Sequence, residues 1–374
     1  MGSTCFLRLL LLCWLVPTLL NAQLVTTSSQ QQRTNRLAAL CKLWGHVTYF
    51  HPYLPPNNSL WDSAFAATVP LVKTGQSRAD YQRVVQQLVA VLNDPATRVI
   101  TTPTPASSQP RAEKQPTQTL TDDSILVVRL GQYADLRDIQ HLQTKAQATQ
   151  QQLKQVKAVL FDLRTERSQP DDQPYMHAFF AELNGLFSTT PIAGLTQRGR
   201  MHDGLPTETG YSTGGFTSAS YSASPDVIEP EAGLDRDLPS VFLVNAQAIL
   251  PPIALALQQA GKAAVVSVGE LADTPLVQTT VFELADSVQV QMRLTQLGSS
   301  ESTPFLKVGY PLAPTTADAV AFSTALQVLR TRAFQAPPPS AIPPVAVVIR
   351  PPSTQPRPIR CWAIACWQPL RSGP

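Results

Sequence analysis

The stretch VNAQAILPPIALALQQAGKAAVVSVGE, residues 244–270, decides the fold, because it joins a strand, a helix and a second strand within one short segment. It starts in the apolar run SVFLVN (240–245), passes through apolar residues at helical spacing from about 251 to 260, and ends in the apolar run KAAVVSV (262–268). Short apolar runs on either side of a helix are typical of buried parallel strands. The stretch therefore predicts a βαβ unit in a partly parallel sheet.

The turn between this strand and this helix has an unusual composition. Parallel sheets place functional groups at the carboxyl ends of their strands. Here the turn holds Ala248, Ile249 and Leu250, followed by Pro251 and Pro252. Proline has no N–H group, so the turn offers few hydrogen-bond donors to a ligand. Whether the chain is an enzyme depends on this turn.

The alternation of strands and helices continues on both sides of the opening stretch. SILVVRL (124–130) and VKAVLFDLR (156–164) read as strands separated by a polar helix at about 135–155. Farther on, TTVFELADSVQVQMRLTQL (279–297) alternates with period two around a central turn, which predicts an antiparallel hairpin at the edge of the sheet. We expect an α/β domain with a mixed sheet and flanking helices over residues 123–332.

A helical region precedes this domain. NRLAALCKLWGHVTYF (35–50) has apolar residues at helical spacing, and SRADYQRVVQQLVAVLNDP (77–95) opens with a capping box and stops at a proline. Residues 34–95 are therefore predicted to form a small all-α domain. Residues 96–122 are rich in Thr, Pro, Ser and Gln, and we expect a linker there.

The two ends of the chain have their own patterns. Residues 1–22 carry Arg8, an apolar run from Leu9 to Leu20, and a small residue at Ala22, as a secretory signal peptide does. The apolar run is shorter than the ~20 residues that cross a bilayer, so we expect no membrane span after cleavage. Export to the periplasm or the extracellular space follows. Residues 333–374 are Pro-rich and lack any structural period, which predicts a disordered tail.

Composition excludes several classes of function. The 374 residues are 43% hydrophobic and 15% charged, and the formal net charge is +3 with no Lys/Arg run. Nucleic acid is therefore not an expected partner. Neither a GxGxxG nor a GxxxxGK[ST] motif occurs, so no nucleotide cofactor is expected.

Metal ligation is also not expected. Three cysteines remain after the signal peptide, Cys41, Cys361 and Cys366, and none has CxxC spacing. His46 and His51 are five positions apart and do not share a helical face. We expect them to belong to a helix that ends in an aromatic cap.

Polar candidates for a binding or catalytic role gather in two places. Asp162 and Arg164 end one predicted strand and Asn245 ends another, at the edge where α/β sheets bind ligands. The alternative for Asp162 and Arg164 is a structural pair. The second place is a loop rich in Gly, Ser and Tyr over residues 199–222, and loops of this kind often line binding sites. Its candidates are Tyr211 for binding and, for catalysis, His202, Ser212, Ser218 and Ser220.

Several short motifs, in one order, resemble those of peptidase family S41, the tail-specific or C-terminal-processing serine peptidases. RLAALCKLWGHVTYFHPYL and WDSAFAATVPLV look like the family's helical N-terminal domain. VKAVLFDLR is similar to the family's strand that ends in Asp-Leu-Arg, and SVFLVN to the strand before its nucleophile. AGKAAVVSVGE and VGYPLAPT resemble later segments. The resemblance implies an S41-like fold and chemistry on peptide bonds, without metal or cofactor.

The same resemblance implies a degenerate catalytic turn. The family's nucleophilic serine falls at Leu250, or at Ile249 if the turn is one residue shorter, and an acidic position falls at Ile253. None of these side chains can attack a carbonyl or move a proton. The family's lysine has only Lys262 as a nearby counterpart, and that residue belongs to the next strand.

Two functions are favoured at this point, and a third possibility, a sugar-binding or cell-surface adhesion domain, has no specific sequence feature behind it. The first is a catalytically impaired S41-like protein that binds a peptide or an unfolded protein segment in the former substrate groove. The second is an active serine peptidase, which uses a displaced serine at 212–222 or forms the N-terminal part of a longer enzyme.

Overall fold

The computed structural model describes residues 29–54, 58–101, 117–130, 138–166, 172–203, 217–223, 225–298 and 303–334. The predicted signal peptide at 1–22 and the tail from residue 335 lie outside these ranges. So do Tyr211 and Ser212.

A six-stranded sheet forms the centre of the larger of two bodies. Its strands, in spatial order, are β14 (Tyr310–Leu312), β10 (Ala263–Val268), β9 (Ser240–Asn245), β4 (Ala158–Asp162), β3 (Ile125–Arg129) and β2 (Thr117–Leu120). Every neighbouring pair is parallel except β2 with β3. The sheet is therefore mixed, and the predicted α/β class is confirmed.

Helices cover both faces of this sheet. Consecutive parallel strands lie side by side, so crossovers of one hand place their helices on one face. These helices are α4 (Ile139–Leu153), α5 (Gln173–Ala181) and α6 (Pro252–Gln259), and their core includes the stacked rings of Phe161 and Phe242, 5.3 Å apart. The other face is covered by α7 (Asp318–Thr331), which packs Ala321, Ala325 and Val328 against the strands.

The smaller body combines helices with a sheet. Its helices are a first helix over 29–50, α2 (Ser59–Thr74) and α3 (Arg78–Ala90). Against them packs a three-stranded antiparallel sheet of β1 (Arg98–Ile100), β12 (Gln289–Arg293) and β11 (Thr279–Glu283). Val290 and Met292 share a core with Tyr81 and Leu88 of α3. The N-terminal helical region is confirmed, and the structure adds a sheet to it.

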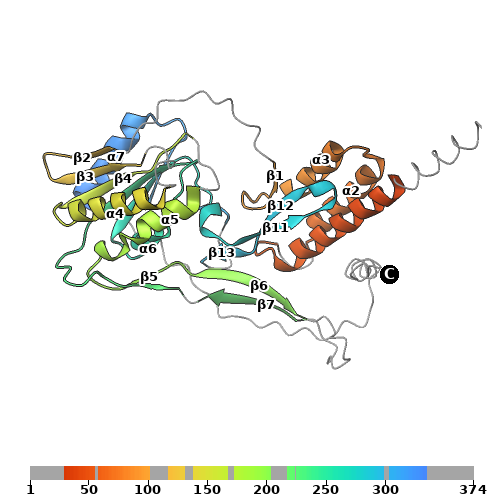
Figure 1. Ribbon diagram of the computed structural model, residues 1–374, viewed down its shortest axis with the longest axis horizontal. Coiled ribbons are helices and arrows are strands. Elements are labelled where there is room, and N and C mark those ends of the chain that lie inside the picture. The colour runs from red at the N-terminus through yellow and green to blue at the C-terminus, as the bar shows by residue number, and fades with distance from the viewer. Residues whose placement is uncertain are drawn as a thin grey trace, which may run out of the picture.

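The hairpin of β11 and β12 corrects one prediction. The period-two pattern was expected to form a hairpin at the edge of the main sheet, and the hairpin is present. It pairs with β1 instead, so residues from late in the chain complete the N-terminal body (Figure 1). The predicted linker differs too, because residues 98–100 form β1 and 117–120 form β2.

A ribbon runs along one side of the molecule from the larger body toward the smaller one (Figure 1). It consists of β6 (Gln197–Asp203) and β7 (Thr217–Ala223), with β13 (Thr295–Leu297) paired to β6. The remaining elements are short: β5 (Ile192–Ala193), β8 (Val227–Ile228), and the 3-10 turns η3 (Asn184–Leu186), η4 (Thr274–Leu276) and η5 (Ala285–Ser287). Among the described helices, none has the length and apolar content needed to cross a membrane.

An ion pair with a buried arginine fixes the tip of the hairpin to the first helix. Arg36 donates from Nε to Oδ2 of Asp286 at 2.6 Å and from Nη1 to the carbonyl of Gly75 at 3.0 Å. The Arg36 side chain is 2% exposed and lies 5.6 Å from the ring centroid of Tyr81. Because the pair joins residues 250 positions apart, it orders two distant parts of the chain.

Asp286→Asn tests this contact without disturbing the left-handed turn, since Asn tolerates the positive φ of 57° that Asp286 adopts. Loss of the carboxylate leaves the Arg36 charge buried, so we expect the free energy of unfolding in urea to fall by about 2–3 kcal/mol. The control is Asp123→Asn, which breaks an exposed pair with Arg330 and should change stability little. Equal effects of the two variants would contradict the role of Asp286.

Candidate functional site

The carboxyl edge of the six-stranded sheet brings together three of the predicted residues. Asn245 ends β9, and its side chain bridges to the loop after β4. Its Nδ2 donates to the carbonyl of Thr165 at 2.7 Å, and its Oδ1 accepts from the Thr165 N–H at 3.3 Å. Asn245 therefore holds the neighbouring loop in place, as a polar residue at a strand end can do.

Asp162 and Arg164 form the structural pair that was the alternative to a binding role. Arg164 donates from Nε to Oδ1 and from Nη2 to Oδ2 of Asp162, both at 2.8 Å. A third bond runs from Nη1 to Oδ1 of Asp318, at 2.9 Å. The hydrogen bonds to Asp162 raise the pKa of Arg164 above its ordinary value. Arg164 thus ties the start of α7 to the edge of the sheet.

The apolar part of the turn after Asn245, from Ala248 onward, points its side chains into the protein. Ile249, Leu250 and Ile253 are 4%, 1% and 1% exposed and belong to the core between the sheet and α6. On the same turn Ala246 and Gln247 are exposed. The position that the resemblance gives to the nucleophile is therefore occupied by a core side chain.

Lys262 lies at the opposite edge of the sheet. It precedes β10, and its Nζ donates to Asp237 at 2.8 Å and to Thr190 at 3.0 Å. A base must lie within hydrogen-bond reach of the group that it activates. Lys262 therefore cannot serve the turn at Leu250.

The candidates on the ribbon lie away from this edge, against the end of the first helix. The His202 ring stacks on Tyr49 with centroids 4.0 Å apart. The register of β6 and β7 places His202 opposite Ser218, and Arg200 opposite Ser220. The side chain of Ser218 lies outside the described part of the chain. The structure thus brings a serine position and a histidine together on the ribbon, separate from Asn245 and Arg164.

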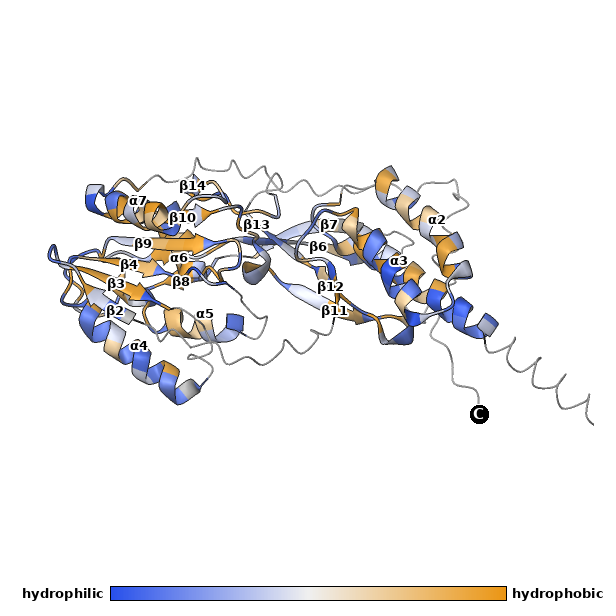
Figure 2. Ribbon diagram, turned by 90° about the horizontal axis from the view of Figure 1, so that it is seen from above, coloured by the Kyte–Doolittle hydropathy of each residue, from blue (hydrophilic) through white to orange (hydrophobic). Residues whose placement is uncertain are grey.

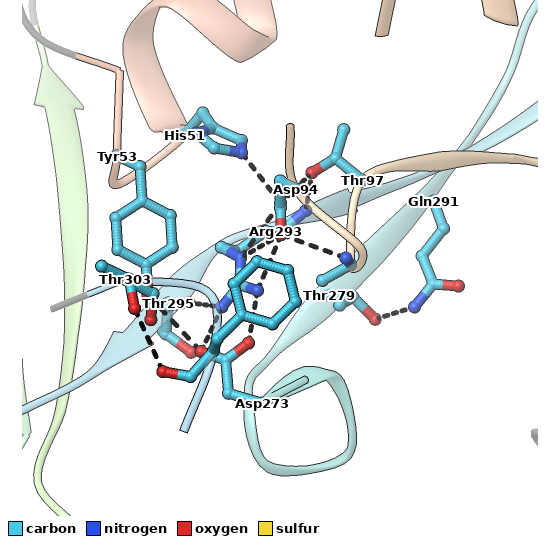
Figure 3. Close-up of polar contacts among 12 residues, drawn as sticks. His51, Tyr53, Asp94, Thr97, Asp273, Thr279, Gln291, Arg293, Thr295 and Thr303 are labelled. Carbon is cyan, nitrogen blue, oxygen red and sulfur yellow. Dashed lines mark hydrogen bonds and ion pairs between the residues drawn. The ribbon is translucent and has the colours of Figure 1, made fainter. Parts of the chain in front are cut away.

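Sequence reasoning missed a buried polar cluster between the two bodies (Figure 3). At its centre Arg293, at the end of β12, is 0% exposed. It donates from Nε and Nη2 to Asp94 at 2.8–3.0 Å, and from Nη1 and Nη2 to Asp273 at 2.8 and 2.6 Å. Asp94 lies between α3 and β1, and Asp273 follows β10. One guanidinium therefore joins both bodies.

Aromatic and hydroxyl groups complete the cluster. Tyr53 lies with its ring 5.0 Å from the Arg293 guanidinium and donates its hydroxyl to the carbonyl of Thr303 at 3.0 Å. Thr97 donates from Oγ1 to Asp94 at 2.7 Å. Figure 3 shows these side chains converging on Arg293 from separate segments.

His51, which follows the first helix, is a buried histidine of the same cluster. Its Nε2 lies 3.0 Å from Oδ2 of Asp94, which is an acceptor when ionised, so Nε2 carries the proton. Its Nδ1 is buried with no partner among the described residues. Arg200 of the ribbon donates to the carbonyls of His51 and Leu54 at 3.1 and 2.6 Å. The end of the first helix, where an aromatic cap was expected, thus contributes His51 to the cluster of charged residues around Arg293.

Burial and pairing shift the pKa values of this cluster in different directions. Burial lowers the pKa of His51, and the nearby charges of Arg293 and Arg200 add to this. Burial raises the pKa of Asp273. For Asp94 burial acts the same way, but hydrogen bonds from His51 and Arg293 outweigh it and hold the pKa well below its ordinary range. His51 is therefore neutral and Asp94 ionised at neutral pH.

No local signal in the sequence marks these residues. Asp94 reads as the residue before the proline that stops α3, and Arg293 as one polar residue in an alternating strand. Within the described residues, no group of His, Cys, Asp and Glu has the arrangement of a metal site. The cluster is an ion-pair junction.

Arg293→Lys tests the geometry of the junction, because lysine keeps the charge and loses the planar, bidentate fork. We expect the free energy of unfolding to fall by about 2–3 kcal/mol, since one ammonium group cannot pair with both Asp94 and Asp273 and leaves a buried carboxylate poorly satisfied. The control, Arg330→Lys at an exposed pair, should leave the urea midpoint nearly unchanged. A small effect of Arg293→Lys would mean that packing alone joins the bodies.

The neutral state of His51 predicts a dependence of stability on pH. The unfolded chain takes up a proton on His51 below about pH 6.5, while the folded chain resists it, so stability is lost as pH falls through that value. The slope contributed is at most about 1.4 kcal/mol per pH unit. Urea unfolding between pH 7.5 and 5.5 should show a weaker pH dependence for His51→Gln than for the wild type. Parallel curves for the two proteins would exclude this role of His51.

Comparison with known proteins identifies the fold. No protein-family model and no curated protein matches the sequence. A solved structure of a putative peptidase from Parabacteroides merdae ATCC 43184 is similar, with a TM-score of 0.51 and 15% identity over 79% of this chain and 96% of that one. A lipoprotein from Streptococcus agalactiae has a TM-score of 0.46 at 10% identity, covering 80% and 97% of the two chains. The photosystem II D1 C-terminal processing protease has a TM-score of 0.40 at 12% identity, covering 79% and 97%.

The likeness to the putative peptidase covers both bodies of the molecule, since 79% of this chain takes part in it. At this level of identity it bears on the fold alone. The chain shares the fold of this solved putative peptidase, in agreement with the fold expected from the sequence motifs.

Proposed function

We propose that this chain is an exported, S41-like protein that lacks peptidase activity and binds peptide or unfolded protein segments at the carboxyl edge of its sheet. One observation carries the proposal: Leu250 occupies the nucleophile position implied by the resemblance and is 1% exposed in the core. Catalysis by a serine peptidase needs a nucleophile, a base and oxyanion donors together. Loss of the nucleophile removes nearly all of the rate enhancement.

The surroundings of Leu250 support the same conclusion. Pro251 and Pro252 carry no N–H group that could stabilise an oxyanion. The nearby lysine, Lys262, is bound to Asp237 and Thr190 at the other edge of the sheet. Restoring one group would therefore not restore the reaction.

Binding without catalysis is supported by what the edge still exposes. Glu166, Ala246 and Gln247 are exposed on two adjacent loops, and Asn245 holds those loops together through Thr165. An edge that exposes a carboxylate and an amide side chain offers hydrogen-bonding groups to a peptide main chain. Export rests on the pattern of residues 1–22, and its test is the N-terminal sequence of the secreted protein.

The alternative is an active peptidase that uses a serine of the ribbon. The register that places His202 opposite Ser218 favours it. A serine of this ribbon would need that histidine as its base, yet the His202 ring is stacked on Tyr49. This version predicts proteolysis that is lost in Ser218→Ala or Ser220→Ala.

The test uses the chain that begins at Gln23, with fluorescein-labelled, reduced and carboxymethylated casein as the probe. We expect no hydrolysis above the level of a buffer blank, and saturable binding in fluorescence anisotropy. Gln247→Trp should weaken binding about tenfold by filling the proposed contact, a loss of about 1.4 kcal/mol.

The matched control is Gln259→Trp, at the exposed far end of α6, which should bind casein as the wild type does. Hydrolysis that Ser218→Ala or Ser220→Ala abolishes would establish the alternative. Equal effects of the two tryptophan variants would place binding elsewhere on the molecule.

A further inference from the structure

β7 forms an open edge of the ribbon. In two perpendicular views the ribbon extends from the larger body toward the smaller one (Figures 1 and 2). Within its sheet, β7 pairs with β6 on one side and with no described residue on the other. Its seven residues, TSASYSA (217–223), include neither a charged residue nor a proline. β7 therefore presents a row of unguarded main-chain groups.

The edge strands of the other sheets are protected. Natural edge strands are usually short, or carry charges or proline, because an open edge pairs readily with other chains. β1 carries Arg98, β11 carries Glu283 and β14 contains Pro311. β2 and β13 are four and three residues long, and β5 and β8 have two residues each. Among the strands that the structure describes, β7 alone combines length with an unprotected edge.

The register of the sheet shows which residues of β7 face the open edge. The N–H of Gly298 donates to the carbonyl of Thr196 at 3.0 Å, so even-numbered residues at the start of β6 turn their main-chain groups toward β13. Odd-numbered residues of β6 therefore turn theirs toward β7, where their partners are also odd-numbered. The N–H and C=O groups of Ser220 and Ser222 accordingly point away from β6.

One face of the ribbon offers an apolar strip beside this edge. His202 stacks on Tyr49 of the first helix, so its face of the ribbon is turned toward that helix. The opposite face carries Met201 and Tyr221, which are 54% and 43% exposed, and the small residue Ala219. Methionine adapts its shape to varied partners. The strip therefore suits apolar side chains of differing shape.

We propose that the open edge of β7 binds extended segments of unfolded protein chains, which add to the ribbon as a further strand. Main-chain hydrogen bonds to Ser220 and Ser222 depend little on the sequence of the segment, while the strip around Met201 favours apolar residues at its alternate positions. The inference rests on the proposed function for its class of ligand, and it adds a second contact to the one at the carboxyl edge.

A second copy of this chain is not the expected occupant. Two paired edges of seven residues bury much less than the ~1,200 Å² of a stable interface. An unfolded chain, unlike a folded copy, can contact the edge of β7 and the carboxyl edge at the same time, and the two contacts then reinforce each other.

Ser222→Pro tests the role of the main chain, because proline removes an outward N–H without removing a bond to β6. The probe is the same labelled casein, measured by fluorescence anisotropy with the chain that begins at Gln23. We expect this variant to bind about fivefold more weakly than the wild type. Ala219→Lys keeps every main-chain group and places a charge on the apolar strip, so it should weaken binding by a similar factor.

The matched control is Leu120→Pro on the short edge strand β2, where Leu120 is 63% exposed. The N–H of Thr121 donates to the carbonyl of Ile125 at 2.9 Å, so the N–H of Leu120 points away from β3. This variant should bind casein as the wild type does. Since edge strands tolerate proline, circular dichroism and the unfolding temperature should match the wild type for both proline variants.

Hydrogen exchange at single-residue resolution tests strand addition directly. In the free protein the amides of Ser220 and Ser222 should exchange rapidly, and that of Tyr221, which points to β6, slowly. Casein should slow exchange at both serines by about tenfold. No slowing at the serines, or casein binding that Ser222→Pro and Ala219→Lys leave unchanged, would overturn the proposal.

The outcomes also separate this inference from the proposed function. Weaker binding by Gln247→Trp but not by Ser222→Pro would keep the carboxyl edge as the site and overturn the role of β7. The reverse result supports β7 and moves binding away from the carboxyl edge. A wild type that does not bind casein contradicts both. Sedimentation velocity without casein tests self-pairing, and a wild-type dimer that Ser222→Pro dissociates would make a second copy the occupant and overturn the proposal.

Discussion

The position of Arg293 between Asp94 and Asp273 is the constraint on which the rest of the structure depends. The three residues come from the end of β12, the loop after α3 and the loop after β10, and the bond from Arg293 to Asp94 spans 199 positions of the chain. A fully buried guanidinium must be neutralised and its donors satisfied. Arg293 meets this need only when both bodies are folded and in contact, so the cluster couples their geometry.

The hairpin of β11 and β12 carries this coupling. It leaves the six-stranded sheet, completes the core of the smaller body with Val290 and Met292, and returns toward the larger body through β13. Asp286 fastens its tip to Arg36, and Arg293 fastens its base. Apolar contacts alone are non-directional and tolerate sliding. The two ion pairs define one register of the hairpin against the helices.

The sequence predicts the parts of this fold that are encoded locally. β3, β4, β9, α6 and β10 are visible as periodic apolar runs, and the capping box of α3 is present because its two bonds join Ser77 to a residue three positions away. The pair of Asp162 and Arg164 could be foreseen as an alternative for the same reason, since the residues are two positions apart.

The hairpin of β11 and β12 shows what local sequence patterns do not predict, namely contacts between distant parts of the chain. Alternation predicts a strand but does not identify the strand with which it pairs. The hairpin of β11 and β12 was therefore wrongly expected at the edge of the main sheet. The cluster around Arg293 could not be predicted, because the bonds from Arg293 to Asp273 and Asp94 cross 20 and 199 positions and each residue has a plausible local role. The burial of Leu250, by contrast, agrees with the apolar composition of its turn.

The turn and the junction bear differently on function. An exposed nucleophile on a strand-to-helix turn requires the turn to project from the core, and such sites commonly reduce stability. With Ile249, Leu250 and Ile253 the same turn packs inward and adds to the core between the sheet and α6. The junction costs desolvation of three charges, and an apolar replacement of similar volume could match its stability. What an apolar junction would not provide is a fixed orientation of the two bodies. A chain that combines a directional junction with a turn at Leu250 filled by core residues is built to hold a shape, which agrees with the proposed binding of segments of other chains.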